Sequence, residues 1–140
     1  MSPRARRAVA EPIRVLLADD SRVQRDGWAL LLGSQPDLEV VAQAGDGAQA
    51  LAIARRQSVD VILMDVRMPR IGGIAATERL LGDPRVAEQG PLPRVILLAT
   101  HDLDDHVPAA AAAGAFAVLY KDVEPEALFE AVRQAGAARA

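Results

Sequence analysis

The stretch VDVILMD, residues 59–65, decides the fold of this chain. It is a short, almost continuous apolar run of strand length that ends in a carboxylate, as expected for a strand covered on both faces. Four further runs rich in Val, Ile and Leu lie at residues 13–18, 38–43, 94–100 and 115–120. Longer stretches with helical periodicity separate them. This alternation predicts five βα units and an α/β fold with a parallel sheet between layers of helices.

The helices are predicted from caps, stop signals and apolar periodicity. The first begins at Ser21, spaced as a capping box with Gln24, and ends at Gly33. The others cover residues 46–56, 73–81 and 104–113 and a segment that starts at Pro125. The inward-facing residues are predicted to be Val23, Gly27, Leu30 and Leu31 in the first helix, Ala48, Leu51 and Ala52 in the second, and Leu128, Ala131, Val132 and Ala135 in the last.

Length and composition limit the class of protein. With 140 residues, 51% hydrophobic and 25% charged, the chain suits one folded domain. The net charge of −3 argues against DNA binding by this segment, and no cysteine is present for a disulfide or a thiolate zinc site. No apolar run approaches the roughly 20 residues that a membrane helix needs. We expect a disordered tail at residues 1–12, without a signal-peptide core, and a C-terminal tail or start of a linker at residues 136–140.

Five polar residues follow or end the predicted strands: Asp19 and Asp20 after the first, Asp65 in the third, Thr100 in the fourth and Lys121 after the fifth. The carboxyl ends of parallel strands form one rim, and open α/β sheets bind ligands there at the point where strand order reverses. The sequence therefore predicts one site built from all five residues.

The residue types in this set indicate phosphoryl chemistry. Three carboxylates held together favour a cation, and an oxygen-only ligand set suits Mg²⁺. Lys121, which is the only lysine of the chain, and the Thr100 hydroxyl can neutralise phosphoryl oxygens. Asp65, at the centre of the rim, is then the predicted nucleophile that forms an acyl phosphate. The alternative is that the strand-end aspartates only cap helices.

Four separated segments resemble the receiver domain of bacterial response regulators: LLADDS (16–21), VILMDVRMPRIGG (61–73), VILLAT (95–100) and AGAFAVLYKD (113–122). The resemblance covers residues 13–135 and implies a doubly wound, flavodoxin-like (βα)5 fold with strand order 2-1-3-4-5. The RMP stretch, the ALLL helix and Lys121 followed by Asp122 are most similar to the NarL/LuxR subfamily.

The resemblance also implies a role for each residue of the rim. Asp65 would accept a phosphoryl group from a sensor histidine kinase, and Thr100 and Lys121 would contact that group. Asp19, Asp20, Asp65 and the backbone carbonyl of Arg67 would hold Mg²⁺. The domain would then be a phosphoacceptor whose only turnover is loss of its own phosphoryl group, and not an enzyme.

Two residues depart from the family pattern near the expected switch, which is the face made by the helix at 104–113, the strand at 115–120 and the last helix. The family's switch aromatic, three residues before the lysine, is Val118 here, and Phe116 and Tyr120 share its side of the strand. We therefore take Thr100, Phe116, Val118 and Tyr120 as switch candidates. His101, beside Thr100, stands where the family often has a small residue and would either slow entry of phosphodonors or be solvated.

NarL/LuxR members usually control transcription through a helix-turn-helix domain that follows the receiver. We expect DNA contact only through such a domain, which is absent from this chain, together with a sensor kinase partner, homodimer formation, no membrane association and a cytoplasmic location. Two alternatives remain. One is a receiver-like interaction module that acts without phosphorylation. The other is a stand-alone Mg²⁺ phosphohydrolase, for which a second general acid beside Asp65 is lacking.

Overall fold

The computed structural model describes residues 11–100 and 107–139, and all statements about the structure concern these ranges. They form a five-stranded parallel sheet in the order β2-β1-β3-β4-β5. Both the α/β class and the predicted strand order 2-1-3-4-5 are confirmed. The strands are β1 (Ile13–Ala18), β2 (Leu38–Ala44), β3 (Val61–Asp65), β4 (Arg94–Ala99) and β5 (Ala117–Tyr120).

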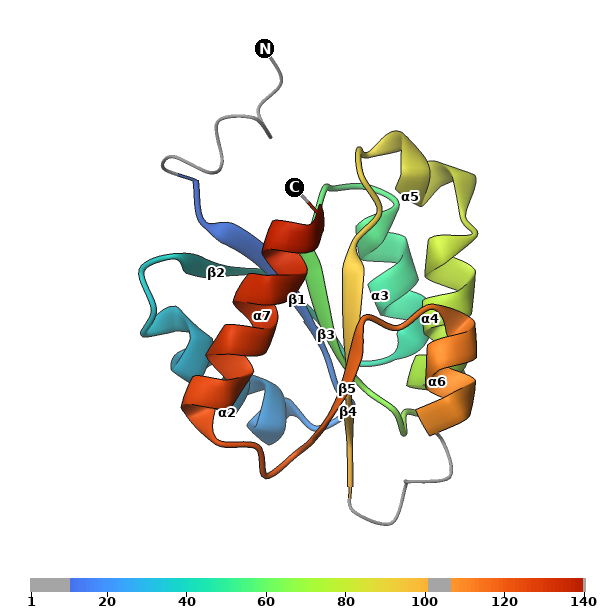
Figure 1. The fold of residues 1–140 in the computed structure, drawn as a ribbon. Helices are drawn as coiled ribbons and strands as arrows, with labels where there is room; N and C mark the ends of the chain where they lie inside the picture. The colour runs from blue at the N-terminus through green and yellow to red at the C-terminus, as the bar shows by residue number, and fades with distance from the viewer. Residues whose placement is uncertain (1–10, 101–106, 140) are drawn as a thin grey trace.

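The helices lie in two layers on opposite faces of the sheet (Figure 1). One layer holds α2 (Arg22–Gly33) and α7 (Pro125–Arg139). The other holds α3 (Gly47–Ala54), α4 (Gly73–Leu81), the short α5 (Pro84–Glu88) and α6 (Val107–Ala113). Each face buries its own apolar cluster, with Leu16, Ile62, Met64 and Leu97 toward α3, α4 and α6, and Leu17, Leu63, Ile96 and Leu98 toward α2 and α7. The central strands are buried on both faces, as their continuous apolar runs predict.

The inward face of α2 differs from the prediction. Val23 and Leu30 are 84% and 81% exposed, and a Cβ added at Gly27 would meet no atom within 4 Å. Leu32 is fully buried instead, and Leu31 is partly buried against the core with Trp28. Because apolar residues occupy every position from 28 to 32, the periodicity fits more than one rotation of the helix. The packing against β1 and β2 selects the one that buries Leu32.

The inward face of α3 was predicted correctly at Leu51, which is partly buried against the core, but wrongly at the two alanines. Ala48 and Ala52 are exposed, whereas Ala50 and Ala54 are buried. A helix with alanine on several sides offers little apolar contrast, so its sequence fixes the helix but not its rotation. In α7, by contrast, Leu128, Val132 and Ala135 are buried and Ala131 is partly buried, as predicted.

The short helix α5 was not predicted. Asp83 caps it by accepting hydrogen bonds from the backbone N–H of Arg85 (2.8 Å) and of Val86 (3.4 Å), and Val86 is buried. Asp83 also pairs with Arg55 at 2.6 Å, which ties this segment to the end of α3. Five residues are too few to produce a helical period, so only the capping aspartate and Pro84 could have indicated this helix.

Strand order reverses between β1 and β3, which lie side by side and lead in opposite directions across the sheet. The carboxyl ends of β1 and β3 therefore meet where open α/β sheets bind ligands. No helix in the described ranges is long and apolar enough to cross a membrane.

Candidate phosphoacceptor site

An acidic cluster lies at this reversal of strand order. Carboxylate oxygens of Asp19, Asp20 and Asp65 all lie within 4.8 Å of one another. Asp19 and Asp20 follow β1 directly, and Asp65 is the last residue of β3. Asp19 and Asp65 are buried, whereas Asp20 is exposed. The structure therefore brings together the three carboxylates that the strand-end pattern predicts.

Asp19 is the strained member of this cluster. Its Oδ1 accepts a hydrogen bond from the backbone N–H of Ser21 at 2.8 Å, but its buried Oδ2 has no hydrogen-bond partner among the residues that the structure describes. Burial raises the pKa of Asp19 above its ordinary value, and the charges of Asp65 and Asp20 act in the same direction, whereas the Ser21 N–H and Lys121 oppose them. A buried carboxylate oxygen without a donor beside two other carboxylates suits a hard divalent cation, so the residues present fit Mg²⁺.

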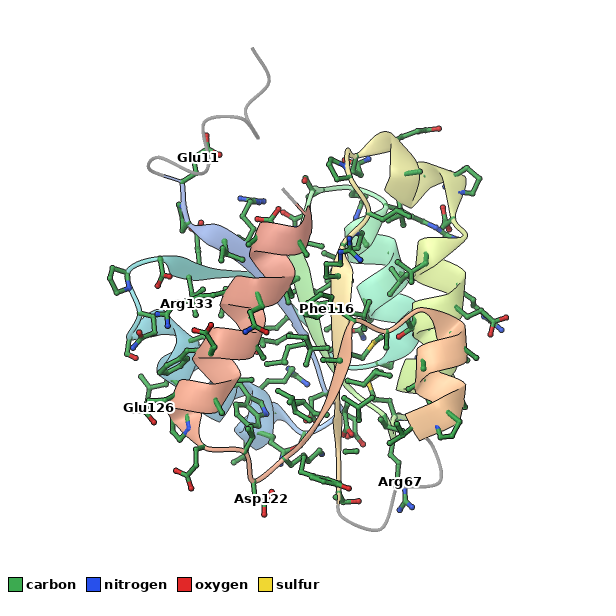
Figure 2. All side chains as sticks on the ribbon, viewed as in Figure 1. Glu11, Arg67, Phe116, Asp122, Glu126 and Arg133 are labelled. Carbon is green, nitrogen blue, oxygen red and sulfur yellow. The ribbon has the colours of Figure 1, made fainter. Side chains whose placement is uncertain are left out.

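Lys121 closes the site from β5. Its Nζ donates to Asp65 Oδ2 at 2.9 Å and lies 3.8 Å from Asp19 Oδ2. Its backbone N–H bonds to the Ala99 carbonyl at 2.8 Å, which fixes the residue against the end of β4. The ammonium is thus placed on the predicted nucleophile, where it can neutralise negative charge. In Figure 2, Arg67 and Asp122, which follow the acceptor and the lysine, both lie at this end of the sheet.

Two residues on α2 also contact the site, and sequence reasoning missed both roles. Gln24 was assigned only to the helix cap, and its backbone N–H does bond to Ser21 Oγ at 3.2 Å. Its side-chain Oε1 also accepts a hydrogen bond from Lys121 Nζ at 2.9 Å. Arg25 donates from Nη1 to the Asp19 carbonyl at 2.5 Å and from Nε to Gln43 at 3.3 Å. Their position one turn after the aspartate pair was the only signal available.

The loop after Asp65 is packed tightly against the backbone of that residue. The Arg67 N–H bonds to Asp65 Oδ1 at 3.2 Å. A Cβ at Gly73 would overlap the carbonyl oxygen of Asp65, so only glycine fits at the start of α4. Arg70 has a φ of 69° and pairs with Asp46, the N-cap of α3, at 3.2 Å. Contacts of Arg67, Arg70 and Gly73 therefore fix the loop that follows Asp65.

The switch candidates lie along β5 and the end of β4. Thr100 directly follows β4 and is exposed. Val118 packs against the core on the α3–α4–α6 side, whereas Phe116 and Tyr120 are each 36% exposed. The Arg94 guanidinium lies 5.8 Å from the centre of the Phe116 ring. Both aromatics and Val118 line a groove of about 280 Å³ beside α6, and His101 lies outside the described residues.

Residues 15–133 match the response regulator receiver domain family. The chain is a response regulator receiver domain. The receiver matches the nitrate/nitrite response regulator protein NarP of Escherichia coli K12 with 41% identity over 124 residues, which cover 89% of this chain and 55% of that protein. The solved signal receiver domain of the response regulator NarL from Mycobacterium tuberculosis superposes with a TM-score of 0.80 at 33% identity, covering 92% of this chain and 99% of the other. The NarL/LuxR resemblance is thus confirmed.

The chain is also similar to part of an enzyme. The protein-glutamate methylesterase/protein-glutamine glutaminase 4 of Myxococcus xanthus DK1622 is 36% identical over 118 residues, which cover 83% of this chain and 31% of that enzyme. The chain spans about half the length of the curated transcriptional regulators that it matches.

Proposed function

We propose that this receiver is phosphorylated on Asp65 by a sensor histidine kinase in a Mg²⁺-dependent reaction. One observation carries the proposal. Asp65 is paired with Lys121 at 2.9 Å while the neighbouring Asp19 keeps a buried oxygen without a partner. A cation and an ammonium on either side of one carboxylate can offset the charge of an incoming phosphoryl group.

The proposed step is a transfer between two nucleophiles. A carboxylate oxygen of Asp65 forms a bond to phosphorus as the phosphorus–nitrogen bond of the kinase phosphohistidine breaks, and the electron pair leaves on the imidazole nitrogen. Lys121 shifts from the carboxylate toward the phosphoryl oxygens, and the Thr100 hydroxyl donates to the same group. Asp19, Asp20, Asp65 and the Arg67 carbonyl would hold Mg²⁺, which would supply charge neutralisation for the phosphoryl oxygens.

Phosphorylation adds about 1.5 to 2 negative charges beside Lys121 and Thr100. Lys121 directly follows β5 and Thr100 directly follows β4. The surface proposed to change on phosphorylation is therefore the face of α6, β5 and α7, where Val118, Phe116 and Tyr120 line one groove. The proposed output is transcription, supported by the likeness to NarP, through an attached DNA-binding domain or a homodimer in the bacterial cytoplasm. Loss of its own phosphoryl group is the only turnover proposed.

Intact mass after incubation with acetyl phosphate tests this function. The wild type should gain one phosphoryl adduct with Mg²⁺ and none without it, and Asp65→Asn should gain none. Asp26→Asn is the matched control, because this aspartate is exposed on α2 and pairs only loosely with Arg22, at 3.9 Å. An adduct on Asp65→Asn, or none on the wild type even with a matched kinase, would leave a phosphorylation-independent interaction module as the better account.

A further inference from the structure

We infer that Gln24 is a positioning residue for phosphoryl transfer, because its side-chain amide holds the Lys121 ammonium beside Asp65. This inference rests on the proposed function and adds a residue to it. Gln24 Oε1 accepts from Lys121 Nζ at 2.9 Å, the same distance that separates Nζ from Asp65 Oδ2. The two residues are 97 positions apart and meet only because α2 and the end of β5 border one rim.

The amide differs from the other partners of this ammonium in one respect. Asp65 at 2.9 Å and Asp19 at 3.8 Å are both carboxylates, whereas Gln24 is neutral. During transfer the ammonium has to give up its Asp65 oxygen, because that carboxylate becomes the nucleophile, and yet remain beside the phosphoryl oxygens. An acceptor without charge holds the ammonium in place and leaves its positive charge available to the incoming group.

Gln24 is itself held by the metal side of the site. Its backbone N–H bonds to Ser21 Oγ, and the Ser21 N–H bonds to Asp19 Oδ1. A continuous series of hydrogen bonds therefore runs from Asp19 through Ser21, Gln24 and Lys121 to Asp65. This series sets the ammonium relative to the carboxylates from the N-terminus of α2. Without Gln24, Asp65 and Asp19 are the partners of Lys121 Nζ that remain among the described residues, so we expect the ammonium to move closer to Asp65.

The test compares Gln24→Met with Gln35→Met. Methionine has a similar length and no strong acceptor. Gln35 Oε1 also accepts from a cation at 2.9 Å, Arg133 Nη2, at the opposite end of the molecule. Uptake of phosphoryl groups from acetyl phosphate at saturating Mg²⁺ should slow by about tenfold in Gln24→Met, the scale on which a lost hydrogen bond to a charged group acts. Gln35→Met should react at the wild-type rate.

A second measurement observes the ammonium directly. Lys121 is the only lysine, so lysine labelled with ¹³C at Cε gives one methylene signal that needs no assignment. In the unphosphorylated, Mg²⁺-free wild type, a held ammonium should give two distinct Hε shifts. In Gln24→Met the two Hε shifts should change and converge. They should stay separate in Gln35→Met and in Gln24→Glu, because both variants keep an acceptor oxygen for Lys121.

The two proposals fail in different ways. If the wild type is phosphorylated and Gln24→Met matches it in rate or in its Lys121 signal, the role of Gln24 is wrong and the phosphoacceptor function stands. If the wild type takes up no phosphoryl group at all, the proposed function fails first.

Discussion

Two buried aspartates at opposite ends of the neighbouring strands β1 and β3 differ in how their side chains are hydrogen-bonded. Asp60, just before β3, is fully buried, and its Oδ2 accepts from the Arg14 backbone N–H at 2.8 Å. Its own N–H and carbonyl bond to the backbones of Arg14 and Arg94. Asp19, after β1, is 3% exposed, and within residues 11–100 and 107–139 one of its oxygens has no hydrogen-bond partner.

This difference indicates that Asp60 contributes to the stability of the fold and Asp19 to the proposed function. At the amino ends of the strands, Asp60 is satisfied by the chain itself, so it stabilises the sheet. At the carboxyl ends, the chain leaves an acceptor open and crowds three carboxylates together, which costs stability and suits an external ligand. Substitutions of Asp60 and of Asp19 should therefore change the free energy of unfolding with opposite signs.

The largest expected effect concerns the backbone that presents Asp65. Gly73→Ala should lower the free energy of unfolding by about 3 kcal/mol, because the added Cβ would overlap the Asp65 carbonyl and neither group can move without shifting β3. Gly27→Ala is the matched control. The Cβ that it adds would point into open space beside α2, and the substitution should raise the free energy of unfolding by about 0.5 to 1 kcal/mol. Urea unfolding measures both, and equal effects would refute the close approach at Gly73.

The next effect should appear at the amino ends of the strands. Asp60→Ala should lower the free energy of unfolding by about 2 kcal/mol, because it leaves the Arg14 N–H without its side-chain acceptor in a buried setting. Asp26→Ala, on the surface of α2, should stay within about 0.5 kcal/mol of the wild type. Acetyl phosphate should still phosphorylate Asp60→Ala wherever the variant is folded. A loss of phosphorylation in the folded variant would show that the two ends are not independent.

The smallest of the three effects should have the opposite sign. The pKa of Asp19 is raised in the folded chain, so the unfolded chain loses this proton first as the pH rises above about 3.8, and stability falls until the folded pKa is passed. At neutral pH the ionised carboxylate therefore opposes folding. Asp19→Asn keeps the Oδ1 acceptor for Ser21 and should raise stability by about 0.5 to 2 kcal/mol at pH 7 without Mg²⁺.

Two conditions sharpen the Asp19 prediction. The gain from Asp19→Asn should disappear below pH 3.8, where the wild-type residue is protonated in both states. Added Mg²⁺ should raise the thermal midpoint of the wild type by mass action and have a smaller effect on the variant. A variant that is less stable than the wild type at neutral pH would contradict the view that Asp19 is strained.

Most of the fold follows from local patterns in the sequence. The apolar runs predict all five strands because buried parallel strands need apolar residues on both faces, and the strand-end rule brings Asp19, Asp20, Asp65 and Lys121 to one rim. The rotations of α2 and α3 do not follow, since Val23, Leu30 and the alanines of α3 satisfy several helical phases equally well. Only contacts with the sheet select between those phases.

The hydrogen bonds within the site are harder to predict from the sequence than the residues that form it. The bond from Lys121 to Gln24 joins two segments 97 residues apart, and its length depends on how α2 is set against β1 and β5. The unpartnered oxygen of Asp19 likewise depends on which donors fail to reach it. Neither property has a local sequence signature, whereas a strand that ends in aspartate does.

The beginning of β1 lies next to the end of α7. Gly136 of α7 approaches Ile13 of β1 so closely that a Cβ there would lie 2.8 Å from Ile13 Cδ1, and Arg94 reaches the Ala138 carbonyl at 3.5 Å. Figure 1 shows this junction at the end of the sheet opposite the carboxyl ends of the strands. Adjacent ends allow a domain to be spliced into a loop of a host protein with short joints. Such an insertion would leave the carboxyl ends of the strands, where Asp65 lies, at the end of the sheet away from the joints, so this receiver suits an engineered sensor that uses the proposed phosphorylation as its input.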